Sequence, residues 1–472
     1  MPPARTVRQQ GSITLEIIIA FAVASLVLTS VILLVGGSDA LAYERSIAER
    51  SLAYESIQDA RIAWSSDIAS MASYASTTER DHVPYSLALI VSAVTPCLTE
   101  LSAAASSTGG VGDGIELRAD LADTALARAL GDDCEYHAAS DWSHPRETGT
   151  APIDATAVDV LGGTVYLGRS MPPYLAVGAG DASLPFQNGF ALSAPPNAID
   201  AALVGGTPYV FAALASSTGQ FVAVDMRDPS HPIIAAQLSL AGINPAGSDP
   251  AAYHVLYYDG RAYVVTRYIA GAQPELHIFD VADPAHAYEM GNANLETTVR
   301  GMTARTRVVH GVAHTFFYAA TTYDTRELAV YDVTDPAHVS LVSSVDLPGT
   351  QDGDSIAAEG NMLYLGRASN TAGPELYAFE VHDPAQAPVL VATAEITSKD
   401  ITAIIPVGSL LFVAATNDGA SNRMLQIWDM SDTAHVYQRA ALKIPGLVLG
   451  GIEYASSTLY AIDATTFHSY ED

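Results

Sequence analysis

Leu276-His277-Ile278-Phe279-Asp280-Val281-Ala282-Asp283-Pro284 is one copy of a motif that recurs after about residue 150 of this 472-residue chain. Each copy is a short apolar strand followed by a turn with acidic residues. The other copies end in Asp225-Met226-Arg227-Asp228-Pro229, Asp332-Val333-Thr334-Asp335-Pro336, Glu380-Val381-His382-Asp383-Pro384 and Asp429-Met430-Ser431-Asp432, and a degenerate first copy runs from Tyr174 to Asp181. Because β-branched and aromatic residues favour strands while Asp and Pro favour turns, the motif predicts a mainly β protein.

A second motif, a turn followed by an aromatic strand, precedes the first. Its seven copies are marked by Tyr166, Tyr209, Tyr263, Phe317, Tyr364, Phe412 and Tyr460. Successive copies lie about 43 to 55 residues apart, which is the length of a four-stranded propeller blade. The spacing predicts a seven-bladed β-propeller over residues 151–472. The last copy, residues 450–472, is too short for four strands, so we expect the chain just before residue 153 to donate a closing strand. A pair of β-sandwiches is the alternative fold, which the even spacing disfavours.

The repeat resembles the LVIVD type found in bacterial surface propellers, whose signature is an apolar strand ending in an Asp-x-x-Asp-Pro turn. The resemblance covers residues 153–472. It implies the fold and leaves the function open, because the same propeller architecture carries many functions.

Thirteen histidines invite the question of metal binding. Four of them occupy one repeat position, three residues after a turn Asp: His231, His286, His338 and His435. Equivalent positions are distributed around a propeller, so these four are expected to be turn residues rather than ligands of one metal. The paired Asp side chains of each turn are expected to hydrogen-bond their own backbone.

Two other segments have spacings that suit a metal site weakly. His310 and His314 are separated as ligands on a helix would be, but Gly311 and the aromatic strand after it predict a hairpin. Asp352-Gly353-Asp354 offers oxygen ligands for calcium, although no full loop of them follows. No nucleophile elbow, phosphate loop or dinucleotide fingerprint occurs, so we expect no enzyme activity, no catalytic residue, no cofactor and no metal.

The N-terminal part carries an apolar run from Ile13 to Val35 in which Glu16 is the one charged residue. At 1.5 Å per residue such a helix is about 35 Å long, enough to cross a bilayer. Arg5 and Arg8 precede the run without an acidic residue, so we expect a cytoplasmic N-terminus and an extracellular C-terminal part. A carboxylate in lipid costs about 2.5 to 3.5 kcal/mol, so Glu16 needs a partner or a role.

This segment resembles the signal of type IV pilins and pilin-like proteins. Gly11 matches the last residue of the leader, Ser12 the first residue of the mature chain and Glu16 its fifth, although the order Ser-Ile-Thr-Leu-Glu departs from the usual one. The resemblance implies cleavage after Gly11 by a prepilin peptidase, N-methylation, and a pairing of Glu16 with the new amine of a neighbouring subunit. It implies a leader at residues 1–11 and a transmembrane and spine helix at 12–73. A secretory signal cleaved after Ala40-Leu41-Ala42, or a simple anchor, is the alternative.

Residues 74–150 are expected to form a small linking domain, which holds the two cysteines of the chain, Cys97 and Cys134. Outside the cell a disulfide between them is the natural pairing, and two buried thiols are the alternative. Residues 117–130 are expected to form a short amphipathic helix and 106–110 a loop.

Composition gives a net charge of −30, from 52 acidic and 22 basic residues, which disfavours nucleic acid and anionic lipid surfaces as partners. We expect a pilin-like, single-pass membrane subunit that displays the propeller on the cell surface for adhesion or for binding a protein or glycan. Because so large a domain would crowd a major fibre, we expect a minor or tip position in a pilus, beside other pilin-like subunits. A binding propeller with no fibre role and an exported enzyme are the alternatives.

Overall fold

The structure is a computed structural model. It describes residues 74–80, 83–95, 98–107, 115–122 and 142–472, the last range with gaps at 180–185, 187, 245–250, 269–272, 310–311, 360, 369–372, 382–383, 397–399, 416–421, 446–450, 456 and 464. The expected leader, membrane helix and processing residues Gly11, Ser12 and Glu16 lie outside the described residues, as do Cys97 and Cys134. Within the described part, no helix has the length and apolar character needed to cross a membrane.

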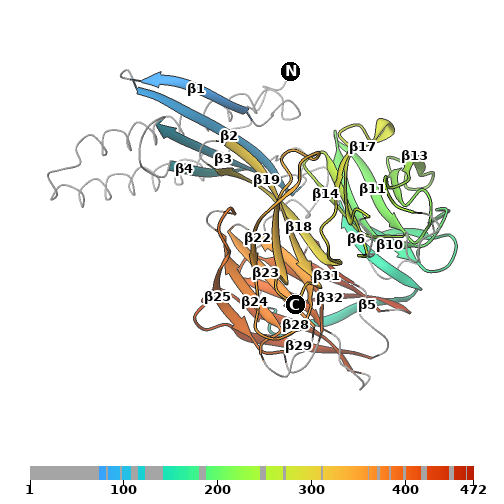
Figure 1. The fold of residues 1–472 in the computed structure, drawn as a ribbon. Coiled ribbons are helices and arrows are strands. Elements are labelled where there is room, and N and C mark those ends of the chain that lie inside the picture. The colour runs from blue at the N-terminus through green and yellow to red at the C-terminus, as the bar shows by residue number, and fades with distance from the viewer. Residues whose placement is uncertain are drawn as a thin grey trace, which may run out of the picture.

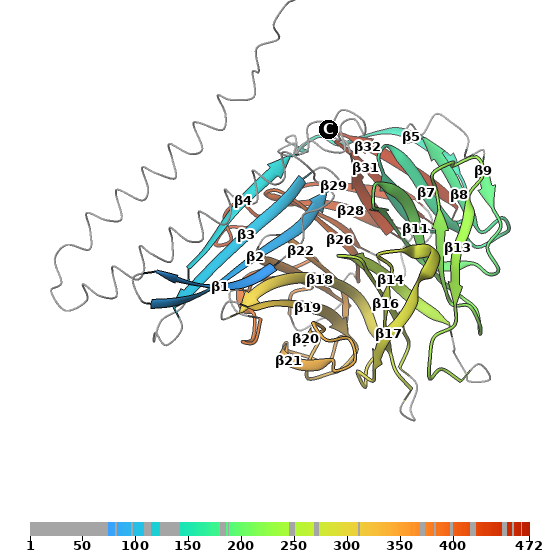
Figure 2. The same cartoon turned by 90° about the horizontal axis from the view of Figure 1, so that it is seen from above.

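Seven four-stranded antiparallel sheets are arranged as the blades of a propeller (Figures 1 and 2). Each sheet is a meander in which consecutive strands pair. The first strand of every blade lies against the first strand of the next, and β30 lies against β6, so the ring is closed. The predicted seven-bladed propeller is confirmed.

The strands of the first four blades are as follows. Blade 1 has β6 (Ala155–Leu161), β7 (Thr164–Arg169), β8 (Leu175–Ala179) and β9 (Asn188–Phe190). Blade 2 has β10 (Pro196–Val204), β11 (Thr207–Leu214), β12 (Phe221–Asp225) and β13 (Ile233–Leu238). Blade 3 has β14 (Ala252–Tyr258), β15 (Arg261–Thr266), β16 (Leu276–Asp280) and β17 (Tyr288–Ala293), with a short 3-10 turn, η3 (Pro284–His286), before β17. Blade 4 has β18 (Val299–Val309), β19 (Val312–Thr321), β20 (Leu328–Asp332) and β21 (Ser340–Val345).

The remaining blades follow the same order, except that the last one borrows a strand. Blade 5 has β22 (Gly353–Glu359), β23 (Met362–Arg367), β24 (Leu376–Glu380) and β25 (Val389–Ala394). Blade 6 has β26 (Ile401–Val407), β27 (Leu410–Ala415), β28 (Asn422–Asp429) and β29 (Tyr437–Pro445). Blade 7 has β30 (Gly451–Ala455), β31 (Thr458–Ile462), β32 (Thr466–Glu471) and β5 (Arg146–Pro152).

The closing strand β5 comes from the chain just before residue 153, as predicted. It pairs antiparallel with β32, with Thr150 opposite His468. The Glu147 carboxylate lies 2.7 Å from the His468 ring. Just before β5, Trp142 is fully buried and packs edge-on against Phe412, with ring centroids 4.9 Å apart. The first and last parts of the propeller are therefore joined by backbone pairing, a side-chain hydrogen bond and an aromatic contact.

Apolar side chains fill the interfaces between neighbouring blades. Between blades 2 and 3, Phe221 stacks on Phe279 with a centroid distance of 4.5 Å, and Phe211 stacks on Tyr257 at 5.3 Å. Such aromatic pairs add about 0.5 to 1.5 kcal/mol beyond the burial of their area. The aromatic residues that marked the repeat all lie in the second strands of blades, which explains why their spacing follows the blades.

The acidic turns behave as predicted. In blade 3, Asp280 accepts a hydrogen bond from the Ala282 N–H at 3.0 Å, and Asp283 accepts one from the Ala285 N–H at 3.2 Å. The second Asp carboxylate also contacts the Nδ1 atom of His286, at 2.8 Å. The same His–Asp pair recurs at His231–Asp228, His338–Asp335 and His435–Asp432. These four histidines are exposed residues of separate turns, as their repeat position predicted.

A separate four-stranded sheet precedes the propeller. Its strands are β1 (Tyr74–Arg80), β2 (Val83–Thr95), β3 (Leu98–Ser107) and β4 (Ile115–Ala122), paired in sequence order. The helix expected at 117–130 is wrong for its first residues: charged and apolar residues alternate from Ile115 to Leu121, which is the period of a strand, and β4 pairs with β3. Strand β2 lies against β18 and β19, the long hairpin of blade 4 (Figure 1).

Candidate functional site

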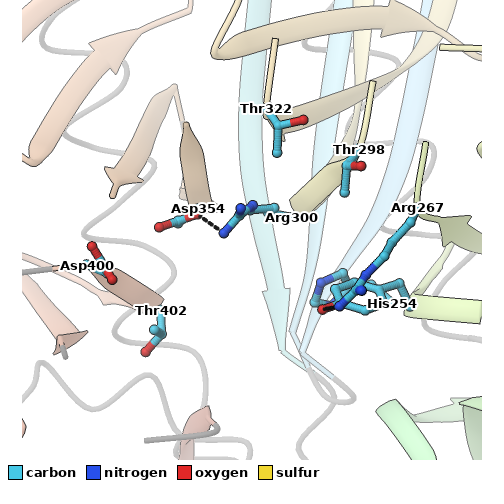
Figure 3. Close-up of a pocket in the computed structure, with 9 residues that line it drawn as sticks. His254, Arg267, Thr298, Arg300, Thr322, Asp354, Asp400 and Thr402 are labelled. Carbon is cyan, nitrogen blue, oxygen red and sulfur yellow. Dashed lines mark hydrogen bonds and ion pairs between the residues drawn. The ribbon is translucent and has the colours of Figure 1, made fainter. Parts of the chain in front are cut away.

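A cavity of about 650 Å³ opens where the innermost strands of blades 3 to 6 begin. We call this side of the ring the mouth face, and the opposite side, which carries the Asp-x-x-Asp-Pro turns, the turn face. The cavity is lined by Tyr253, His254, Arg267, Thr298, Arg300, Thr322, Asp354, Asp400 and Thr402 (Figure 3). Ligand sites are usually concave and lined by a few polar groups, so this cavity is the candidate site.

The lining residues come from a few repeat positions. The second residue of the innermost strand lies at a register shift in blades 1 to 6, where one extra residue is inserted into the strand pairing. A β-bulge of this kind leaves its residue unpaired and redirects the side chain, and bulges are common beside active sites. The bulge residues are Thr156, Asn197, Tyr253, Arg300, Asp354 and Thr402.

The geometry of the bulge repeats while its chemistry changes from blade to blade. In blades 1 and 2 the bulge residue ties neighbouring strands: Thr156 donates to the Pro196 carbonyl at 2.8 Å, and Asn197 donates to the Ala252 carbonyl at 2.7 Å. In blades 3 to 6 the bulge residues line the cavity instead. The residues just before the strands, Thr298 and Asp400, add to the same lining.

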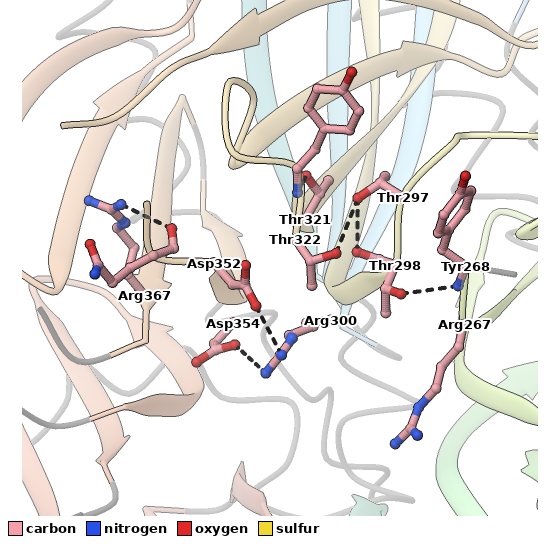
Figure 4. Close-up of polar contacts among 12 residues, drawn as sticks. Arg267, Tyr268, Thr297, Thr298, Arg300, Thr321, Thr322, Asp352, Asp354 and Arg367 are labelled. Carbon is pink, nitrogen blue, oxygen red and sulfur yellow. Dashed lines mark hydrogen bonds and ion pairs between the residues drawn. The ribbon is translucent and has the colours of Figure 1, made fainter. Parts of the chain in front are cut away.

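Arg300 holds two carboxylates of the neighbouring blade (Figure 4). One guanidinium nitrogen lies 2.9 Å from Asp354 and the other 3.0 Å from Asp352. The Asp352-Gly353-Asp354 segment, considered above as a weak calcium site, therefore has an arginine where a cation would sit. No set of three or more His, Cys, Asp or Glu side chains in the described part of the chain is placed to hold a metal ion.

On the acidic side of the cavity, burial and neighbouring carboxylates make the ionised form of Asp354 unfavourable. Burial raises the pKa of the Asp354 carboxyl to about 6; the Arg300 charge opposes this rise, and the charges of Asp400 and Asp352 add to it. Two like charges in a partly desolvated site repel each other far more than in water. Asp354 and Asp400, on blades 5 and 6, form this wall of the cavity.

The opposite wall, at blade 3, is aromatic and basic. The Arg267 guanidinium lies 4.3 Å from the centroid of the Tyr253 ring and donates a hydrogen bond to the Tyr253 hydroxyl. Burial lowers the pKa of His254 to about 4, so its imidazole is neutral at physiological pH. The His254 ring packs edge-on against Tyr253 at 5.2 Å, and its nitrogens have no hydrogen-bond partner among the residues that the structure describes.

A second polar group lies at one repeat position of the innermost strands of blades 7, 1 and 2. Glu453 and Asp159 pair with Tyr460 and Tyr166, which mark the aromatic strands of their blades, and Asp200 pairs with Phe211, two residues after Tyr209. Asp159 accepts a hydrogen bond from the Ala201 N–H and Asp200 one from the Tyr257 N–H, so each acid ties its strand to the next blade. Burial raises the pKa of Asp159 to about 7 and those of Asp200 and Glu453 well above their usual values.

The structure brings together few of the residues singled out from the sequence. Asp352 and Asp354 belong to the mouth, whereas His314 lies in the predicted hairpin, where its ring contacts Asp332 at 2.8 Å. Gly11, Ser12, Glu16, Cys97, Cys134 and His310 are outside the described residues. Sequence reasoning missed Tyr253, His254, Arg267, Arg300 and Asp400. Aligned copies would have shown them as the positions where chemistry changes at a constant place in the repeat.

Comparison with known proteins agrees with the repeat. The LVIVD repeat model matches residues 267–294. That range runs from Arg267 at the mouth through β16 and β17. No curated protein sequence matches the chain.

Solved structures with a related shape differ widely in name. A "putative 6-phosphogluconolactonase" from Bacteroides uniformis is 12% identical, with 63% of this chain and 83% of that chain covered and a TM-score of 0.41. Sqt1 from Chaetomium thermophilum is 9% identical (82% and 91% covered, TM-score 0.41), and hydrazine synthase from Kuenenia stuttgartiensis is 12% identical (68% and 95% covered, TM-score 0.44). Similarity at this level assigns none of these activities to the chain.

Proposed function

We propose that this protein is a cell-surface binding protein whose propeller captures a ligand in the mouth-face cavity and whose N-terminal segment anchors it as a pilin-like subunit. The observation that carries the binding role is the set of four bulge residues, different in each of blades 3 to 6, that line one cavity. A side chain needed only for folding would be expected to repeat with the blades, as the turn residues do.

The binding role is tested by a thermal-shift screen of the full-length chain in detergent against a library of small metabolites and sugars. The wild type is compared with Arg300→Met and with a matched control, Arg227→Met. Arg227 also pairs with an aspartate, Asp225, at 2.6 Å, but on the turn face. We expect some compounds to raise the melting temperature of the wild type and of Arg227→Met but not of Arg300→Met. A screen in which every stabilising compound acts equally on Arg300→Met would contradict a binding role for this cavity.

The anchoring role rests on the apolar run from Ile13 to Val35, on Glu16, and on the spacing from Gly11 to Glu16. Mass spectrometry of the N-terminal peptide from cells is expected to show a chain that begins at Ser12 and carries an N-methyl group. Glu16→Ala is expected to reduce incorporation into surface fibres while the propeller stays folded. A chain that keeps its leader, or one that begins at Tyr43, would contradict the pilin-like role without touching the binding role.

An exported enzyme is the second candidate, and one observation favours it. A neutral imidazole, His254, lines the same cavity as the carboxylates of Asp354 and Asp400. Such a group can act as a general base when a substrate hydroxyl or water lies within hydrogen-bond reach. Comparing wild type and His254→Ala with a panel of ester, lactone and glycoside substrates tests this candidate, and turnover that the substitution abolishes would favour it over simple binding.

A further inference from the structure

Three polar groups that line the mouth-face cavity have hydrogen-bonding capacity that the described residues leave unused. The Asp354 side chain is only 9% exposed. One of its oxygens accepts a hydrogen bond from Arg300 at 2.9 Å, and the other points away from Arg300 without a hydrogen-bond partner in the described part of the chain (Figure 3). The two nitrogens of His254 are in the same position. The Thr298 hydroxyl accepts the Tyr268 N–H at 3.0 Å and keeps its own proton to donate. Because a desolvated polar group without a partner costs free energy, these groups favour a ligand that hydrogen-bonds to them.

A ligand with a net charge meets a like charge in this part of the cavity. An anion would approach the carboxylates of Asp352 and Asp354, and a cation would approach the Arg300 guanidinium that pairs with both of them. His254 is neutral at physiological pH, because burial lowers its pKa to about 4. Hydroxyl groups suit these residues better: a hydroxyl donates to a carboxylate, and it can donate to one imidazole nitrogen or accept from the other. The cavity therefore favours a neutral ligand with several hydroxyl groups.

Two exposed tyrosines stand beside the cavity, at one repeat position of neighbouring blades. Tyr268 and Tyr323 lie two residues after the ends of β15 and β19, and they are 47% and 41% exposed. The backbone N–H of each donates to a threonine hydroxyl, which fixes the chain where the ring begins. The Arg326 guanidinium covers one face of Tyr323, 4.2 Å from the ring centroid. The ring of Tyr268 has no ring contact or hydrogen bond with any described residue, and it points away from Arg267 (Figure 4).

An uncovered aromatic ring of this kind offers a flat surface to a ligand. The face of an aromatic ring is the negative part of its quadrupole, so it attracts the slightly positive C–H groups of another molecule. A sugar ring presents C–H groups on its faces and hydroxyl groups around its rim. The cavity and the tyrosine beside it thus supply the partners for both parts of a sugar.

We propose that the mouth face binds a neutral glycan, with the hydroxyl groups of one sugar ring at Asp354 and His254 and the C–H face of a neighbouring sugar ring on Tyr268. This inference rests on the proposed binding function and names its ligand class. The cavity volume of about 650 Å³ lies within the usual range of small-molecule sites, roughly 300 to 1,000 Å³.

The test is calorimetric titration of the full-length chain, in a detergent without a sugar headgroup. The probes are glucose, galactose and mannose, each beside its 2-amino derivative and its uronic acid, together with the disaccharides cellobiose, maltose, lactose and mannobiose. We expect at least one neutral sugar to bind about tenfold more tightly than its cationic and its anionic derivative. A disaccharide that contains this sugar is expected to bind more tightly still, because its second ring reaches Tyr268.

Variants identify the groups that recognise the sugar. His254→Phe keeps a ring and removes both nitrogens, so we expect affinity to fall about tenfold, the usual effect of losing one or two hydrogen bonds. Tyr268→Ala is expected to reduce the affinity for the disaccharide to that for the monosaccharide, whereas Tyr268→Phe retains the wild-type value, because stacking needs the ring and not the hydroxyl. Tyr288→Ala is the matched control: this tyrosine is 55% exposed at the start of β17, beside a turn of the turn face, and its loss should change nothing.

The inference is overturned if no neutral sugar of the panel binds more tightly than its charged derivatives, or if either His254→Phe or Tyr268→Ala leaves the affinity for the disaccharide unchanged. Failure of this inference is distinguishable from failure of the proposed function. If a compound that is not a sugar stabilises the wild type in the thermal-shift screen and Arg300→Met abolishes the effect, the glycan is wrong and the cavity remains a binding site. If no compound of that screen, sugars included, depends on Arg300, the binding function itself is wrong.

Discussion

The turn face and the mouth face of this propeller both repeat their backbone geometry from blade to blade. The residue types repeat on the turn face and vary on the mouth face. On the turn face, an Asp–His pair three residues apart recurs in four blades with Nδ1 to Oδ2 distances from 2.7 to 3.0 Å. On the mouth face, a bulge recurs in six blades, but its residue is Thr, Asn, Tyr, Arg, Asp and Thr in turn. The comparison teaches that repeated chemistry at a repeat position serves the architecture, whereas divergent chemistry at such a position marks a candidate site.

Ring closure is the architectural feature whose loss should cost most. Trp142 is fully buried and contacts Phe412 and Tyr454 at the junction of blades 6 and 7. We expect Trp142→Ala to lower the free energy of unfolding by about 3 to 5 kcal/mol, the usual cost of deleting a buried aromatic side chain. Chemical denaturation of the full-length chain measures it. A loss below about 1 kcal/mol would show that the closure does not depend on this contact.

The buried acids of blades 7, 1 and 2 sharpen the comparison, because they occupy one repeat position in only three blades, and two of them, Asp159 and Asp200, accept a hydrogen bond from the next blade. The pKa of Asp159 rises from 3.8 to about 7 in the fold, so the folded state holds more protons than the unfolded state between these values. Its contribution to stability is therefore present at low pH and is lost as the pH rises from about 4 to about 7. Asp200 and Glu453 act in the same direction.

The measurement is the difference between wild type and Asp159→Asn in denaturant unfolding from pH 4 to pH 8. Taking the difference removes the opposite effect of His254, whose lowered pKa makes stability fall as the pH drops below about 6.5. We expect the free energy of unfolding of the variant to rise by about 1 to 2 kcal/mol relative to wild type across this range, a figure discounted for the partial exposure of Asp159. Parallel pH profiles of the two proteins would contradict the assignment.

The smallest expected effect concerns a tight turn of blade 2. Gly205 has a φ of +57°, and a Cβ there would meet no neighbouring atom. Because the left-handed conformation costs a non-glycine residue about 1 kcal/mol or slightly more, Gly205→Ala should destabilise the propeller by about that amount through the backbone alone. Denaturant unfolding measures the cost, and ligand binding at the mouth serves as the control, which should stay unchanged.

Most of the propeller could be predicted from the sequence because its signals are local. A turn Asp and the N–H it accepts from are two residues apart, as at Asp280 and Ala282, and the aromatic strands follow directly along the chain. Even the closing strand could be predicted, because the last repeat is too short and the missing strand must come from somewhere. By contrast, the helix expected at 117–130 was wrong where a charged and apolar alternation of period two competes with the helical period.

The candidate site could not be predicted in the same way, because its residues lie far apart in the sequence and form no motif. Tyr253 and Thr402 line one cavity although they lie 149 positions apart in the chain. In the sequence, nothing distinguishes Arg300 from an ordinary surface arginine. In the folded ring it pairs with both Asp352 and Asp354. Only the packing of blades 3 to 6 side by side brings these side chains together.

Replacing all four cavity-lining bulge residues by the asparagine that blade 2 uses tests the central comparison most directly. The variant Tyr253→Asn, Arg300→Asn, Asp354→Asn and Thr402→Asn is measured twice: for its free energy of unfolding, and for its affinity for the tightest compound of the thermal-shift screen. The bulge in blade 2 already accommodates asparagine, so we expect the free energy of unfolding to stay within about 2 kcal/mol of that of the wild type. We expect the affinity to be at least a hundredfold weaker, because four side chains that line the cavity are replaced. An unfolded variant, or a folded one that binds as tightly as wild type, would contradict the claim that the divergent bulges form the binding site.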